Sequence, residues 1–89
     1  FNGSKFNQPI GDWNVSNVTN MSWMFNSYLF NQDISKWDTS SVINMTRMFE
    51  SSKFNQDISK WVIRQDCVTF NMFDWCHIKE KYRPKPLQR

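Results

Sequence analysis

The strongest constraint on the fold is an eight-residue segment, Phe30–Trp37, that returns unchanged at Phe54–Trp61, 24 residues later. A looser copy, Phe6–Trp13, precedes both at the same spacing of 24 residues. A fixed period of this length is typical of repeat architectures, in which each unit buries its apolar face against its neighbours. The sequence therefore predicts an array of stacked 24-residue units.

Each unit has two halves with different apolar spacing. In the first half a β-branched residue stands among polar neighbours, which suits a short strand with that residue pointing inward. These residues are Ile10, Ile34 and Ile58. In the second half apolar residues recur at spacings of three and four, which suits a 3₁₀ turn or a short α-helix. In the first unit they are Val15, Val18, Met21, Met24 and Phe25. The predicted fold class is an α/β solenoid of short parallel strands and 3₁₀ turns or short helices, with a C-terminal cap.

Stacking places equivalent positions of successive units side by side, so single residue types should form ladders. The expected aromatic ladders are Trp13, Trp37 and Trp61; Phe1, Phe25, Phe49 and Phe73; and Phe6, Phe30 and Phe54. The methionines share the apolar phase, which places them in the core and not in a cofactor site. The asparagines Asn7, Asn31 and Asn55 should form a ladder that hydrogen-bonds the neighbouring backbone, because buried turns need their polar groups satisfied.

The third unit departs from the pattern. Asp66 and Thr69 stand where the earlier units have apolar residues, as expected where no further unit covers the core. Beyond it, alternating Pro84 and Pro86 favour an extended, polyproline-like arm. We divide the chain into repeat units over residues 1–73, a cap over 74–82 and a basic tail over 83–89.

The motif Phe-Asn-Gln-Asp-Ile-Ser-x-Trp, followed by Val-x-x-Val-x-x-Met-x-x-Met-Phe, resembles the BspA-type repeat. That repeat is a divergent relative of leucine-rich repeats found in mycoplasma lipoprotein-like surface proteins of unknown function, and also in bacterial, protist, algal and giant-virus proteins. The likeness covers residues 1–73 and is clearest over 30–49. The close of the chain, residues 72–84, looks like the end of such arrays in large DNA viruses.

The resemblance implies a leucine-rich-repeat-like solenoid that makes protein–protein contacts or attaches to a surface, without catalysis. We expect a cell-surface or extracellular location and a protein partner, within a longer chain or larger complex. The alternative is a small structural component of a large assembly, such as a giant-virus capsid or a multisubunit complex, located in the virion. A nucleophile–base pair, a phosphate loop and a carboxylate constellation are all missing from the sequence, so we do not expect an enzyme, a small-molecule substrate or a cofactor.

Two surfaces are candidates for partner binding. The first is the polar face of the repeated segment, for which a solvated face without a ligand is the alternative. Its residues are Gln32, Asp33, Ser35, Lys36, Gln56, Asp57, Ser59 and Lys60. The second is the tail, for which a frayed terminus is the alternative. Its residues are Lys81, Tyr82, Arg83 and Lys85.

Charge separates the tail from the rest of the chain. Residues 1–78 hold six Lys or Arg against seven Asp or Glu, whereas residues 79–89 hold five against one. Nucleic-acid binders usually carry a basic face on the folded body, so we expect no nucleic-acid partner. Long apolar runs are absent, so we expect no membrane insertion.

The two cysteines, Cys67 and Cys76, can pair in a single disulfide that would staple the last unit, or can fill the cap as buried thiols. With the adjacent His77 they do not have the spacing of a zinc site, so we expect no metal. The sequons at Asn2, Asn14, Asn17, Asn20 and Asn44 follow from the repeat pattern, and at most one or two should be glycosylated in a secreted, eukaryotic context.

Overall fold

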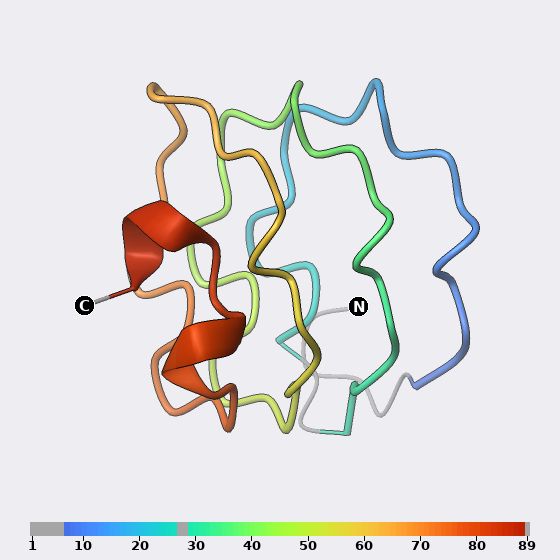
Figure 1. The fold of residues 1–89 in the computed structure, drawn as a ribbon, viewed down its shortest axis with the longest axis vertical. Coiled ribbons are helices and arrows are strands. Elements are labelled where there is room, and N and C mark those ends of the chain that lie inside the picture. Colours follow the sequence, from blue (N-terminus) through green and yellow to red (C-terminus); the bar gives the residue numbers. More distant parts are fainter. Residues whose placement is uncertain (1–6, 27–28, 89) are drawn as a thin grey trace.

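The structure is a computed structural model that describes residues 7–26 and 29–88. The chain passes repeatedly around one interior, and successive passes lie side by side from the N-terminal end to the C-terminal end (Figure 1). Backbone hydrogen bonds join equivalent parts of neighbouring units: the N–H of Met21 donates to the carbonyl of Asn44 at 2.8 Å, and the N–H of Met45 donates to the carbonyl of Val68 at 2.7 Å. The positions Phe1, Phe6 and Asn2 lie outside the described residues.

The predicted fold class, an α/β solenoid, is wrong. Over residues 7–26 and 29–88 the chain forms neither a β-strand nor an α-helix. Its regular elements are two short 3₁₀ helices, η1 (Glu80–Tyr82) and η2 (Lys85–Leu87). Among the described residues, the β-bridges between units are two isolated parallel ones, Asn20 with Asn44 and Asn44 with Val68, which do not extend into a sheet. The domain is instead a small globule of turns.

The predicted strand is replaced by a turn in each unit. The N–H of Trp37 donates to the carbonyl of Ile34 at 3.1 Å, and the equivalent bond joins Trp61 to Ile58 at 3.0 Å. An i to i+3 bond of this kind closes a β-turn, so the backbone reverses where the alternation predicted an extended segment. The isoleucines are nevertheless buried, with Ile34 fully inaccessible to solvent. The pattern thus identified the inward residue correctly and the backbone conformation incorrectly.

The second half of each unit, predicted as a 3₁₀ turn or a short α-helix, forms turns and not an α-helix, because alternate N–H groups donate to a neighbouring unit. The N–H of Phe25 donates to the carbonyl of Met48 at 2.8 Å, whereas an α-helix needs an acceptor four residues back in its own segment. One residue per unit also has a positive φ at the same phase: Trp23 (61°), Arg47 (54°) and Asn71 (54°). Helices do not continue through a left-handed residue, because its side chain would approach the following carbonyl too closely.

The core contains most of the predicted ladders, but Trp13 of the tryptophan ladder is exposed. Phe49 stacks on Phe25 and Phe73, with ring centroids 5.6 Å and 5.7 Å apart, and Trp37 stacks on Trp61 at 6.4 Å. Each of these tryptophans also satisfies a carbonyl of the preceding unit, since the Nε1–H of Trp37 donates to Ile10 at 3.1 Å. Met21, Met45, Met48 and Met72 are buried, and Met24 packs against the core. The assignment of these residue types to the core is therefore confirmed.

The asparagine ladder is also confirmed. The Oδ1 atom of each asparagine accepts the backbone N–H of the residue one unit later: Asn31 donates to Asn7 at 3.0 Å, Asn55 to Asn31 at 2.8 Å, and Lys79 to Asn55 at 2.9 Å. The ladder therefore runs from the first unit to the start of the C-terminal segment.

The C-terminal segment folds back onto the third unit. The predicted extended arm is not formed at Lys85–Leu87, which is η2. The carbonyl of Tyr82 accepts the N–H of Ile58 at 3.0 Å, Pro84 is fully buried, and Leu87 packs against the core. Tertiary contacts thus override the preference of the Pro-containing sequence for an extended chain, and the tail covers part of the open end of the core.

Candidate interaction surface

The structure brings the two copies of the predicted polar face together, but its glutamines bond within the array. The Nε2 of Gln32 donates to Oδ1 of Asn7 at 2.9 Å, and the Nε2 of Gln56 donates to Oδ1 of Asn31 at 3.2 Å. These side chains extend the asparagine ladder and stabilise the stacking of the units.

The aspartates of this face hold turns. Oδ1 of Asp33 accepts the backbone N–H of Ser35 at 2.9 Å, and Oδ1 of Asp57 accepts that of Ser59 at 3.0 Å. Hydrogen bonds from these serines lower the pKa of both carboxyl groups, so the aspartates stay ionised at neutral pH. Lys36 and Lys60 remain exposed and are the members of this face most available to a partner.

The tail residues are mostly committed to packing. The guanidinium of Arg83 lies 5.2 Å from the centroid of the Phe73 ring, and the Nζ of Lys81 lies 5.6 Å from that of Tyr82. Both are cation–π geometries. Lys85, in η2, is exposed. The four predicted tail residues are therefore brought together on the C-terminal end of the domain, with Lys81 and Lys85 the exposed members.

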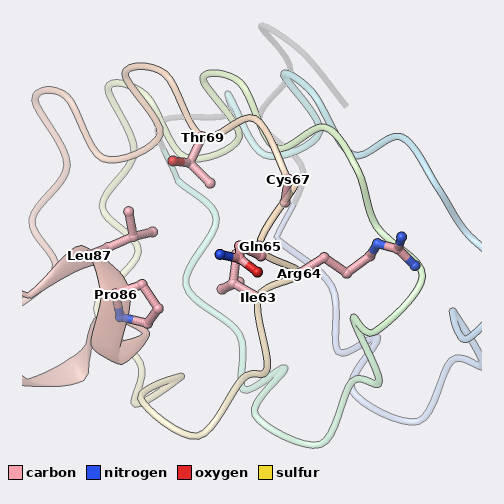
Figure 2. A pocket seen from close by; sticks show the side chains of 7 residues that line it. All are labelled: Ile63, Arg64, Gln65, Cys67, Thr69, Pro86 and Leu87. Carbon is pink, nitrogen blue, oxygen red and sulfur yellow. The ribbon is translucent and has the colours of Figure 1, made fainter.

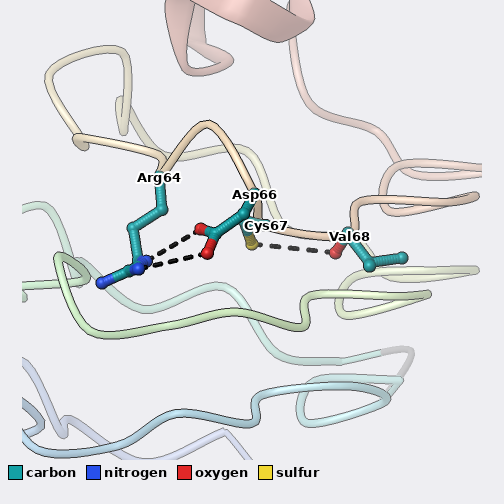
Figure 3. Close-up of polar contacts among 4 residues, drawn as sticks. All are labelled: Arg64, Asp66, Cys67 and Val68. Carbon is teal, nitrogen blue, oxygen red and sulfur yellow. Dashed lines mark hydrogen bonds and ion pairs between the residues drawn. The ribbon is translucent and has the colours of Figure 1, made fainter.

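The two cysteines are free thiols in the structure, so the candidate disulfide is not formed. Cys67 points to the carbonyl of Val68 at 3.7 Å, beside the ion pair of Arg64 with Asp66 (Figure 3). Cys76 donates to the carbonyl of Phe54 at 3.3 Å, and burial raises its pKa to about 11, so it stays protonated at neutral pH. Within residues 7–26 and 29–88, no group of three or more His, Cys, Asp or Glu is arranged to hold a metal ion.

A hollow of about 410 Å³ separates η2 from the third unit (Figure 2). Pro86 and Leu87 face it from η2, and Ile63, Cys67 and Thr69 face it from the segment opposite. The hollow exists because the tail covers only part of the third unit. It presents apolar carbon on both walls.

The third unit carries a set of exposed apolar residues that was not predicted from the sequence. Phe70 and Trp75 expose 74% and 86% of their surfaces, and Val62 and Val68 are also exposed. Val68 and Phe70 stand at the positions equivalent to the polar residues Asn44 and Thr46 of the central unit. A comparison of the units phase by phase could have found this replacement of polar by apolar residues. We call Val68, Phe70 and Trp75 the apolar end residues.

Residues 1–83 match the family model described as "Mycoplasma protein of unknown function, DUF285". The chain belongs to this family. The match of the DUF285 family model spans the repeat units, η1 and Arg83, and it stops before η2. Searches of curated proteins and of solved structures found no match to the chain.

Membership of the DUF285 family agrees with the repeat pattern and with the expected likeness to mycoplasma proteins, but the description assigns no activity. The likeness to BspA-type repeats is a finer statement that the family match leaves open. Among the helices of the described residues, none has the length and apolar character needed to cross a bilayer.

Proposed function

We propose that this DUF285 domain is a non-catalytic module that binds a protein partner, and that it does so at a cell surface. The observation that carries the proposal is the exposure of the apolar end residues, Val68, Phe70 and Trp75, on so small a domain. Aromatic residues are enriched at protein interfaces, and exposed apolar surface of this kind marks interaction sites. The polar face predicted from the sequence is the weaker candidate, because its glutamines and aspartates bond within the domain.

The state of the titratable groups supports a non-catalytic role. A general acid or base works best when its pKa lies near the operating pH. Hydrogen bonds from serine or arginine partners lower the pKa of four aspartates, which moves them further from neutral pH. They are Asp33, Asp38, Asp57 and Asp66. Burial raises the pKa of Cys76, which disfavours the nucleophilic thiolate.

The alternative is a structural component of a large assembly such as a virion, in which the units would pack between larger subunits and the basic tail would extend into a neighbouring one. Residues 80–87 fold against their own chain instead. The folded tail therefore removes one support for this alternative, and we retain the first proposal.

The test is a binding measurement on matched variants. The immobilised domain captures proteins from surface extracts of the source cells, and each captured candidate is purified and titrated against the wild type and the Phe70→Ser/Trp75→Ser variant. We expect affinity to fall at least about tenfold, as for interface anchor residues. Trp13→Ser is the control, because Trp13 is an exposed tryptophan in the first unit. If the double variant binds with unchanged affinity and Lys36→Glu/Lys60→Glu binds more weakly, the partner binds the polar face and not the apolar end residues.

A further inference from the structure

A row of open backbone donors lies along the end of the third unit. In the central unit, the N–H groups of Met45, Arg47 and Phe49 donate across to the third unit at 2.7, 2.9 and 3.0 Å. The equivalent groups one unit later belong to Thr69, Asn71 and Phe73. Within the part of the chain that the structure describes, these three N–H groups have no acceptor.

The row continues at Trp75. Its counterpart in the central unit, Ser51, donates its N–H to the carbonyl of Asp74 at 2.8 Å, whereas the N–H of Trp75 meets no acceptor among the described residues. Beside the row, the buried Nε of Arg83 likewise has no hydrogen-bond partner there. Unpaired donors of this kind cost free energy when they are shielded from water, and an exposed row of them is a template for pairing with another chain.

The tail fills only half of the position that a fourth unit would occupy. Lys79 continues the asparagine ladder, and Tyr82 bonds to Ile58, so residues 79–82 take the place of the first half. The chain then turns into η2 and leaves the hollow beside Ile63 and Thr69 (Figure 2). A folded second copy of the domain cannot stack here, because its first half would coincide with residues 79–82. The remaining half has room for a single segment that follows the turn path of residues 68–74.

Charge indicates the chemistry of that segment. The open groups of the row are backbone N–H donors, so the occupant must present carbonyls at alternate residues. Val68, Phe70 and Met72 present theirs in this way to the equivalent row of the central unit. Residues 79–89 hold five Lys or Arg against one Glu, and Lys85 is exposed next to the hollow. Acidic side chains are therefore favoured at the outward positions of the occupant, and an apolar side chain is favoured toward Leu87.

We propose that the partner of this domain inserts a single acidic segment along Thr69–Trp75, folded into turns like those of residues 68–74. The segment pairs its carbonyls with the open N–H row and anchors an apolar side chain in the hollow beside Leu87. The inference rests on the proposed protein-binding function, which it deepens by naming the class of partner and the mode of recognition. It adds backbone pairing to the contacts made by the exposed aromatic residues.

The test uses synthetic peptides copied from residues 41–51, the segment whose carbonyls accept the N–H groups of Met21, Trp23 and Phe25 in the intact domain. An acidic probe carries Ile43→Glu and Arg47→Glu, and a basic probe carries Ile43→Lys and keeps Arg47. We expect the acidic probe to bind at least about tenfold more tightly than the basic one, since the probes differ by several charges near a basic tail. On binding, the amides of Thr69, Asn71 and Phe73 should become protected from hydrogen exchange.

A matched pair of charge variants completes the test. Lys85→Glu should weaken binding of the acidic probe about fivefold, and Lys36→Glu, on the polar face, should leave it unchanged. Protection of other amides, equal binding of the two probes, or no binding of the acidic probe would overturn the inference. The proposed function would survive each of these results if the captured partner still depended on Phe70 and Trp75, so the two failures are distinguishable.

Discussion

The central and third units begin with the same eight residues and then diverge. Val42 and Met45 of the central unit are fully buried, whereas their counterparts in the third unit are an exposed Asp66 and a half-buried Thr69. On the outer side the exchange is reversed, since Phe70 is exposed where the central unit has Thr46. The central unit, with neighbours on both sides, buries most of its apolar residues, and Ile43 is its exposed one among those described. The unit at the end has fewer core positions to fill and places apolar residues outside, where a partner can reach them.

The largest expected effect contrasts two tryptophans of one ladder. Trp37 exposes 4% of its surface and Trp13 exposes 48%. Trp37→Ala should lower the free energy of unfolding by about 3–5 kcal/mol, because it opens a cavity and leaves the carbonyl of Ile10 without the Nε1–H bond. Trp13→Ala should cost about 1 kcal/mol. Urea unfolding followed by circular dichroism measures both. Equal losses would contradict the contrast between packed and peripheral units.

The next effect concerns the asparagine ladder. Oδ1 of Asn31 accepts from both Asn55 and Gln56, so Asn31→Ala should cost about 1–3 kcal/mol, the range for leaving hydrogen-bonding groups unpaired. Asn17→Ala is the control, because Asn17 is exposed and should change stability by less than about 0.5 kcal/mol. A loss in Asn31→Ala no larger than in the control would mean that the ladder adds nothing to stability.

A smaller increase in stability is expected when a residue with positive φ is replaced by glycine. Ser51 has φ 61°, and Trp75 occupies the same phase of the third unit with φ 58°. Ser51→Gly should stabilise the domain by about 0.5–1 kcal/mol, since glycine adopts positive φ without steric cost. Ser41→Gly should instead destabilise it, because Ser41 is not among the residues with positive φ. The difference in thermal midpoint between the two variants measures the effect, and a loss of stability in Ser51→Gly would argue against the turn geometry.

The smallest effect is the response to acid. Asp38 and Asp57 have pKa values lowered from 3.8 by hydrogen bonds from Ser40 and Ser59. A carboxyl whose pKa is lower in the folded state contributes stability above its unfolded pKa, and this contribution is lost as the pH falls through the folded value. Unfolding midpoints should therefore decline below the ordinary aspartate range, and should decline less in Asp38→Asn/Asp57→Asn. If the unfolding midpoints of the variant and the wild type decline equally with pH, other titratable groups cause the decline.

The sequence could predict which residues are inside and which stack on one another, because a constant period places equivalent residues side by side. Phe49 between Phe25 and Phe73 follows directly from that argument. The backbone class could not be predicted in the same way. Apolar spacings of three and four suit a helix, and equally suit a turn whose N–H groups bond to the next unit, as that of Phe25 does.

The candidate site was predicted only in part. The polar face was identified by its repetition, but the side chains of Gln32 and Asp33 hydrogen-bond to other residues of the repeat units. The open N–H row at Thr69 and Asn71 depends on where the tail turns away. That turn is a tertiary event, since Pro84 is buried against the third unit and no local preference of the sequence encodes it.

The most direct test of the account is amide hydrogen exchange, read residue by residue by NMR on the isolated domain. The N–H groups of Met45, Arg47 and Phe49 donate to the third unit and should exchange slowly, at rates set by unfolding. The equivalent groups of Thr69, Asn71 and Trp75 should exchange much faster. Equal protection in the two units would contradict the open edge, and with it the contrast between the central unit, whose N–H groups bond to a neighbour, and the third unit, whose equivalent groups do not.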